Sequence, residues 1–342
     1  MPGLFEGAFG DNDRAVPILE HDERLFQVEA HKNPLTAMIG QDSEMATNAL
    51  QDWEIEKEGV IPLAGVMDGE DVTSFNSQSL DSLESYVAHL REPWMVTKIG
   101  GMTKSAAVKD QVTYQRKKAL ERLKRKIERV LGSGIEMARG NKTTPYMTRG
   151  AFAWMVASLQ TLTGKTVPTD YMPPTAAVHT GTLTALDADA FEAMLTAASN
   201  QKLDSLSLFG VAGLGLKSHM SAWTQKVDYD ATPNQQLVSY NASVMDKRFV
   251  KMVNTFEFDA GIVEVMLNQN LCYDAAGAAT DYTTRSGLFL DLEVWKKRYM
   301  QQVKEFELTD GGGGRRGYAD AILMLKCGCP AGQVAVYSSS DS

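Results

Sequence analysis

The glycine-rich stretch GVAGLGLKS at residues 210–218 is the part of this sequence that comes nearest to a known chemical motif. A phosphate-binding loop needs glycine directly before its lysine, but Leu216 precedes Lys217. A dinucleotide-binding loop needs a third glycine at the position of Ser218. The spacing therefore favours a closely packed strand-to-helix turn, and a cytoplasmic nucleotide-binding enzyme is kept only as an alternative.

The three cysteines and five histidines do not form a metal or catalytic motif. Cys327 and Cys329 are one residue apart, and no second pair of Cys or His residues lies at a ligand spacing. The histidines are scattered, and the sequence contains neither a zinc-binding histidine pair nor a nucleophile elbow. We therefore expect no metal site, no cofactor and no enzymatic activity.

Clustered charge is the stronger chemical signal. Residues 103–131 predict one long helix, because apolar side chains recur at helical spacing between Thr103 as N-cap and Gly132 as the stop. Between residues 116 and 129, eight basic side chains stand against two acidic ones: Arg116, Lys117, Lys118, Arg122, Lys124, Arg125, Lys126 and Arg129. Such a face is either a solvated surface or a contact for nucleic acid or for an acidic surface of another chain.

Two acidic segments precede this helix in a chain of net charge −9. Residues 1–48 carry nine acidic and three basic side chains, and residues 49–78 carry seven and one, so each segment has a net charge of −6. The acidic balance argues against a dedicated nucleic-acid reader. We expect the second segment to contact the basic helix of a neighbouring subunit through Trp53, Glu54, Glu56, Glu58, Asp68, Glu70 and Asp71.

Length and composition indicate a globular protein of one or two domains. The 342 residues can bury a large core, and 44% hydrophobic and 23% charged residues are ordinary values for a globular chain. No run of about eighteen apolar residues and no secretory signal is evident, so we expect no membrane span. Three cysteines do not indicate a disulfide framework, which fits folding in a reducing cytoplasm.

The elements around the basic helix predict a mixed α+β fold. Residues 49–56 and 83–99 form the strands of a long hairpin with a large polar tip, which cannot bury both faces alone. Residues 184–199 predict an amphipathic helix capped by Asp187, followed by a buried strand at 205–211. Further strands are expected at 248–268, folded at residues 259–261, and at 288–308, 321–325 and 333–337.

The order of these parts resembles the major capsid proteins of tailed bacteriophages, which have the Hong Kong 97-type fold. Six stretches carry the resemblance: PLTAMIG (34–40), TNALQDWE (47–54), MDGEDV (67–72), SYVAHLREPWMVTKIGG (85–101), KMVNTFEFDAGIVEVMLNQNL (251–271) and LFLDLEVW (288–295). The resemblance, in the order of its parts, covers most of the chain. The tetraglycine at 311–314 and the segment CGC at 327–329 depart from the pattern.

The resemblance implies a named part for each segment. Residues 1–48 would be an N-terminal arm, 49–100 an extended loop lying across a neighbouring subunit, and 101–139 a peripheral domain holding the spine helix. Residues 140–285 would form the axial domain, and 286–342 the strands returning to the peripheral domain. The implied function is self-assembly as hexamers and pentamers into an icosahedral shell that encloses double-stranded DNA.

The same resemblance sets the expected partners and leaves one other shell protein open. The chain would bind itself and packaged DNA without sequence specificity, with portal, scaffold or decoration proteins as further partners and no membrane. It would belong to the virion capsid and assemble in the host cytoplasm. A non-viral nanocompartment shell of the same fold, enclosing protein cargo, is the second alternative.

Overall fold

The computed structural model describes most of the chain. The described residues are 33–57, 63, 65–69, 71, 75, 80–102, 110–162, 165–223, 226–229, 236–239, 254–271, 285–309 and 312–337. The segment expected as an arm is described only from residue 33, where the short helix α1 (Pro34–Met38) begins.

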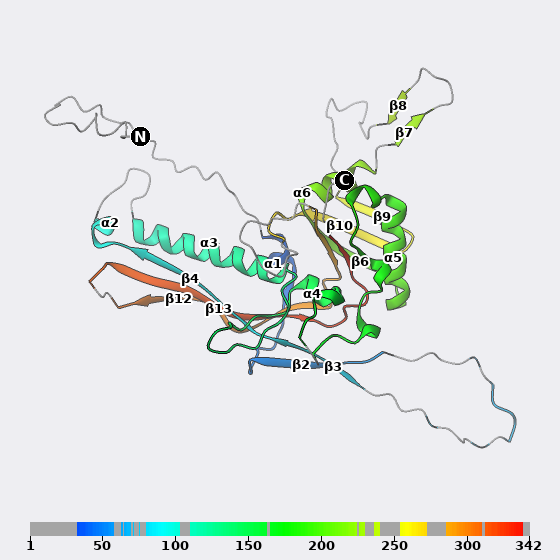
Figure 1. The fold of residues 1–342 in the computed structure, drawn as a ribbon, viewed down its shortest axis with the longest axis horizontal. Coiled ribbons are helices and arrows are strands. Elements are labelled where there is room, and N and C mark those ends of the chain that lie inside the picture. Colours follow the sequence, from blue (N-terminus) through cyan, green and yellow to red (C-terminus); the bar gives the residue numbers. More distant parts are fainter. Residues whose placement is uncertain are drawn as a thin grey trace.

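A four-stranded sheet and one long helix make up the elongated half of the molecule (Figure 1). The strand order is β1 (Gly40–Gln41), β12 (Trp295–Leu308), β13 (Arg315–Cys327) and β4 (Ala88–Val96). The pairs β12–β13 and β13–β4 are antiparallel, and β1 lies parallel to β12. The helix α3 (Gln111–Leu131) lies along this sheet, and its Val112 and Ala119 pack with Trp94 and Val96 of β4.

The long helix begins later than we expected. Its N-cap is Asp110, whose side chain accepts hydrogen bonds from the backbone N–H groups of Val112 and Thr113, so the predicted start at Thr103 is wrong. The helix α2 (Lys98–Met102) is a separate element, and residues 103–109 lie outside the described part. The predicted stop at Gly132 is confirmed.

A six-stranded sheet forms the other half of the molecule. Its order is β5 (Val178–His179), β14 (Val334–Val336), β11 (Gly287–Leu290), β6 (Leu206–Ala212), β10 (Gly261–Leu267) and β9 (Thr255–Phe258). Side chains of α5 (Ala188–Lys202) and α6 (Leu214–Ala222) share one buried cluster with this sheet. Residues 286–342 thus contribute two strands to each sheet, whereas we expected them to return only to the peripheral domain.

One continuous apolar core joins the two halves. It contains Leu123 and Ile127 of α3, Trp295 of β12, and Val211 and Leu288 of the six-stranded sheet. Figure 1 shows the four-stranded sheet on one side of the molecule and the six-stranded sheet on the other, so the two meet near its middle. The orientation of one sheet relative to the other is therefore set by packing.

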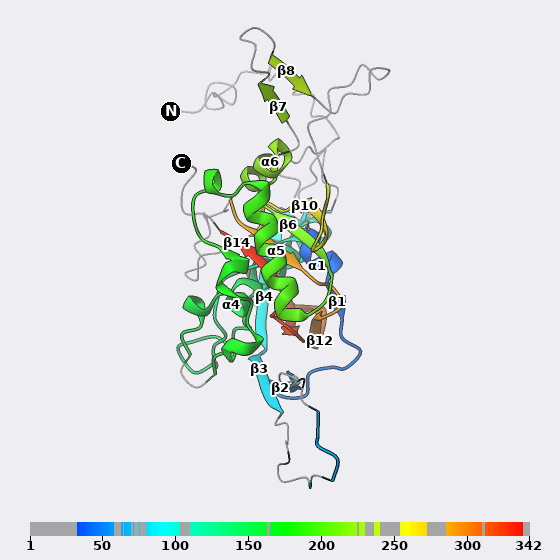
Figure 2. The ribbon, with the colours of Figure 1, turned by 90° about the vertical axis from the view of Figure 1, so that its right-hand side faces the viewer.

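A hairpin leaves the body beside this boundary. Its strands are β2 (Leu50–Ile55) and β3 (Asp81–Tyr86), which pair antiparallel (Figure 2). The hairpin is confirmed, but its second strand was predicted too long, because residues 88–96 form β4 and pair with β13 in the four-stranded sheet. The remaining elements are the helix α4 (Ala151–Met155), the ribbon of β7 (Lys226–Tyr229) and β8 (Gln236–Ser239), and four 3₁₀ turns at 157–159, 169–171, 175–177 and 183–185.

Candidate assembly surfaces

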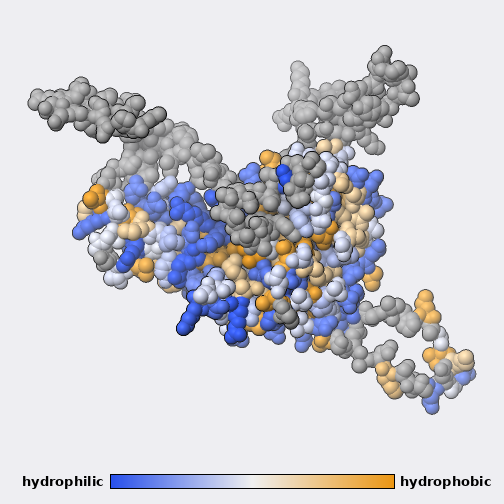
Figure 3. Space-filling model, in the orientation of Figure 1, coloured by the Kyte–Doolittle hydropathy of each residue, from blue (hydrophilic) through white to orange (hydrophobic). Residues whose placement is uncertain are grey.

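The described part of the β2–β3 hairpin tip carries large, highly exposed apolar side chains. Leu63 is 107% exposed, Val66 76%, Met67 81% and Phe75 87%. Figure 3 shows these described tip residues far from the body, with apolar colour at the end of the loop. An exposed apolar group of this size is typical of a contact with another molecule.

The acidic side chains that we assigned to this loop are exposed where the structure describes them. Glu54 and Glu56 lie at the base, and Asp68 and Asp71 lie beside the apolar tip residues. Glu58 and Glu70 lie outside the described residues.

Trp53 belongs to the root of the hairpin and packs within its own subunit. Its indole Nε1–H donates to the carbonyl of Cys327 at 3.0 Å, and its ring lies 5.6 Å from that of Trp154, centroid to centroid. Two polar contacts fix the other strand of the root. Tyr171 Oη donates to Asp81 at 2.9 Å, and Lys165 pairs with Glu84 at 2.7 Å. The root of the hairpin is therefore anchored within its own subunit, and Trp53, which we expected at a contact between subunits, is half-buried there.

The basic residues of α3 fall into three groups. Three of them pair within the chain: Arg116 with Glu305, Lys118 with Glu121, and Lys126 with Glu92. Lys117, Arg122 and Lys124 are exposed. Because Val112, Leu123, Ile127 and Leu131 face the core, these three cations lie on sides of the helix turned away from it. Arg125 and Arg129 are half-buried.

The open face of the four-stranded sheet is partly apolar at its far end. Met95, Arg316 and Leu308 lie opposite one another across three strands, and Pro93, Tyr318 and Phe306 form the next row. Alternate residues of a strand point to opposite faces, so these rows point away from α3, which packs on Trp94 and Val96. Met95, Phe306 and Leu308 are exposed, and we call this surface the distal sheet face.

Aromatic and charged contacts stiffen the distal sheet face. The rings of Phe306 and Tyr318 stack with centroids 5.1 Å apart, and the guanidinium of Arg91 lies 4.1 Å above the Tyr318 ring. Arg91 also donates to Asp320 at 3.1 Å, and His89 is hydrogen-bonded to the same carboxylate at 2.7 Å. Burial of Asp320 raises the pKa of its carboxyl, but the hydrogen bonds from His89 and Arg91, together with the charges of these two side chains, lower that pKa overall.

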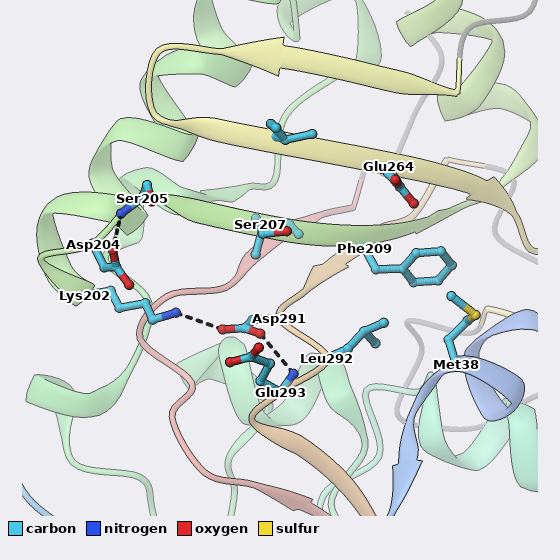
Figure 4. A pocket seen from close by; sticks show the side chains of 12 residues that line it. Met38, Lys202, Asp204, Ser205, Ser207, Phe209, Glu264, Asp291, Leu292 and Glu293 are labelled. Atoms are coloured by element: carbon cyan, nitrogen blue, oxygen red, sulfur yellow. Dashed lines mark hydrogen bonds and ion pairs between the residues drawn. The ribbon is translucent and has the colours of Figure 1, made fainter.

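A cavity of about 370 Å³ lies between α1 and the six-stranded sheet (Figure 4). Four carboxylates line it, from Asp204, Glu264, Asp291 and Glu293, and Lys202 pairs with Asp291 at 2.8 Å. That hydrogen bond and the charge of Asp291 raise the pKa of Lys202. Figure 4 shows Glu264 across the cavity from this pair, on a separate strand, so the polar groups do not converge on one reacting position.

The glycine-rich turn is a structural element. Gly213 is the N-cap of α6, and Lys217 in the first turn is buried. Its Nζ donates to Asn254 Oδ1 at 2.8 Å and to the carbonyl of Val265 at 2.7 Å. Burial lowers the pKa of this amine. The ammonium faces the chain itself, which agrees with the predicted packed turn and gives no support to a nucleotide site.

The part of the chain that the structure describes contains neither a metal site nor a membrane-spanning helix. No group of His, Cys, Asp and Glu side chains there could hold a metal ion, and Cys327 and Cys329 are free thiols. Nor does any helix of the described part have the length and apolar character needed to cross a bilayer.

Taken together, the extended hairpin, the long helix on a four-stranded sheet and the second, six-stranded sheet define the Hong Kong 97-type capsid fold. Solved capsid structures match over nearly their whole length. Against the capsid asymmetric unit of cyanophage A-1(L), the TM-score is 0.66 at 13% identity, covering 96% of this chain and 98% of that one. Gordonia phage Cozz gives 0.59 at 10% identity, covering 95% and 93%. The capsid of a native GTA particle gives 0.59 at 9% identity, covering 96% and 98%.

The family model of the SU10 major capsid protein matches residues 14–336. The chain belongs to this family and is a major capsid protein of the tailed-phage type. No curated protein matches its sequence. The family and the fold confirm the resemblance read from the six sequence stretches.

Proposed function

We propose that the chain assembles as hexamers and pentamers into an icosahedral shell around double-stranded DNA, and that the hairpin tip of each subunit docks on a neighbour. The exposed apolar tip carries this proposal. In a lone subunit, Leu63, Met67 and Phe75 meet water almost fully, which is unfavourable by about 1.5–3 kcal/mol for each large apolar side chain. Docking on a neighbouring subunit removes that cost.

The chemistry of the tip selects its acceptor. An apolar tip needs an apolar surface, and the outward side of α3 offers cations instead. The distal sheet face offers Met95, Phe306 and Leu308 for the tip, together with Arg316 for the acidic residues beside it. We therefore assign the tip to the distal sheet face of a neighbour, in place of the basic helix that the charge pattern alone favoured. Charge pairs at the rim would steer the docking more than strengthen it.

The test compares two substituted chains with the parent by electron microscopy and sedimentation after expression. The variant Met67→Ser/Phe75→Ser removes the tip anchors, and Leu203→Ser removes an apolar side chain of similar exposure from the end of α5. We expect closed shells from the parent and from Leu203→Ser, and unassembled subunits from the tip variant. Normal shells from the tip variant would refute the docking.

The exposed cations of α3 are assigned to packaged DNA. Lys117, Arg122 and Lys124 would contact phosphates without reading sequence, so retention of DNA should weaken with added salt. Reversing these three charges to Glu should leave shell assembly intact and lower the DNA content of filled particles. If the same variant instead fails to assemble alongside wild-type subunits, the helix is an inter-subunit contact and the DNA assignment is wrong.

The remaining parts of the proposal follow from the capsid family. The chain would work without catalysis or cofactor, assemble in the host cytoplasm and meet portal, scaffold or decoration proteins in the growing shell. The five-part division into arm, loop, peripheral, axial and returning segments stays a proposal, with β11 and β14 moved to the axial part because they pair in the six-stranded sheet. Protein in place of DNA inside purified particles would favour the nanocompartment alternative.

A further inference from the structure

A buried carboxylate lies where three separate parts of the chain meet. Glu128, in the last turns of α3, is 1% exposed. Its Oε1 accepts hydrogen bonds from the backbone N–H of Leu35 at 2.9 Å and from Asn268 Nδ2 at 2.7 Å. Its Oε2 accepts from the backbone N–H of Thr36 at 2.5 Å and from the Thr36 hydroxyl. One side chain thus joins α1, α3 and the residue that follows β10.

Glu128 supplies the cap that α1 lacks locally. The N–H groups in the first turn of a helix have no partner inside the helix. The N-cap residue Asn33 makes no side-chain hydrogen bond to them, so the two that remain after Pro34 are satisfied from α3. A helix of five residues is too short to hold itself in water. The place of α1 is therefore set by Glu128 and by the burial of Leu35.

The basic side chain of Lys297 lies near Glu128 and bonds to the same helix α1. Lys297 of β12 donates to the carbonyl of Thr36, and the negative charge of Glu128 opposes the burial that lowers the pKa of Lys297. Burying a carboxylate carries a large desolvation cost, and apolar packing at the same place is often as stable or more so. A satisfied buried polar network instead fixes one geometry, because each donor must keep its acceptor.

We propose that Glu128 is a positioning residue for shell assembly. It holds α1 and the end of β10 in one arrangement on α3. The point where the preceding 32 residues join the body, and the direction of the six-stranded sheet, are thereby defined relative to the long helix. This inference rests on the proposed assembly for its consequence, but the positioning itself is measured on the unassembled chain.

The first measurement is amide hydrogen exchange of the unassembled chain. Glu128→Gln keeps the size of the side chain but places an NH₂ group against one set of donors. Glu121→Gln removes an exposed, Lys118-paired carboxylate from the same helix and serves as the control. We expect the amides of Leu35 and Thr36 to exchange about tenfold faster in Glu128→Gln, with the centre of α3 unchanged. Unchanged exchange at these two amides would overturn the positioning role.

The second measurement is the shell-size distribution at a temperature where both variants are fully folded. Glu128→Gln should give more aberrant or open particles than Glu121→Gln, a result that loss of stability alone does not produce in folded subunits. Particles identical to the control would overturn the consequence for assembly. If the parent and the control also form no shells, the proposed function fails, and hydrogen exchange alone decides the positioning role. Thr36→Val, which removes one donor, gives a smaller change in the same direction should Glu128→Gln not fold.

Discussion

Replacing Trp53 should detach the root of the hairpin from the body. The substitution Trp53→Ala removes the hydrogen bond to the Cys327 carbonyl, which contributes about 1 kcal/mol. It also removes the ring contact with Trp154 at 5.6 Å, a further ~1 kcal/mol. Loss of buried aromatic surface adds about 2 kcal/mol, below the usual value for Trp because the side chain is only partly buried. The free energy of unfolding should fall by roughly 4 kcal/mol, the sum of these contributions.

Urea unfolding of the unassembled chain, followed by circular dichroism, measures this loss. Trp53→Phe is the matched variant, because it keeps an aromatic ring against Trp154 and gives up the hydrogen bond, so its expected cost is about 1–2 kcal/mol. A cost below 1 kcal/mol for Trp53→Ala, or equal costs for the two variants, would refute the described anchoring of the hairpin.

Three further predictions concern pH, backbone geometry and thiol reactivity. Burial raises the pKa of Asp42, but hydrogen bonds from Arg298 and a backbone N–H, with nearby positive charge, lower it overall from 3.8. The ion pair of Asp42 with Arg298 therefore stabilises the fold above about pH 4, and this contribution is lost as the pH falls through the lowered pKa of Asp42. In an acid titration, Asp42→Asn should lose less stability than the parent as the pH falls. Gly261→Ala should cost about 3 kcal/mol in thermal unfolding, since φ is +155° and a Cβ would collide with the backbone carbonyl oxygen of Leu206 in β6. Burial raises the pKa of the Cys327 thiol, so an alkylating agent followed by peptide mass spectrometry should label Cys329 in the folded chain and Cys327 only after unfolding.

The sequence correctly predicted the capped helix α5 and the turn between β9 and β10. Asp187 caps α5, and its side chain accepts from the N–H of Ala190, as expected of an N-cap before an amphipathic run. The strands β9 and β10 fold back at residues 259–261, where Gly261 takes the conformation that other residues rarely adopt. The helix cap and the turn each depend on a few neighbouring residues, so both could be predicted from the sequence.

Features that depend on distant residues were beyond the sequence. Thr103 and Asp110 are both acceptable N-caps, and nothing local selects the second. The apolar runs at β11 and β14 are equally suited to either sheet, and their place is decided by pairing with β6 and β5. In the sequence, Glu128 is indistinguishable from a solvent-exposed carboxylate on a basic helix. Its buried role depends on four hydrogen-bond donors from residues 35, 36 and 268, which are distant in the sequence.

The candidate assembly surfaces could likewise be predicted only in part from the sequence. The acidic loop and the basic helix were visible as charge, but the apolar tip was hidden by its polar neighbours, and exposure at Met67 and Phe75 appears only in the structure. Three of the predicted cations turned out to pair within the chain. The spacing of charges along a sequence predicts a charged face, and the partner of each charge has to be found in three dimensions.

The central claim is that the hairpin tip of one subunit lies on the distal sheet face of the next. An electron-microscopy reconstruction of particles from the chain expressed alone, or with its neighbouring gene products, tests it most directly. We predict closed shells in which Leu63, Met67 and Phe75 are covered by Met95, Phe306 and Leu308 of an adjacent subunit. Shells in which the tip faces solvent, or lies on the exposed cations of α3, would contradict the account.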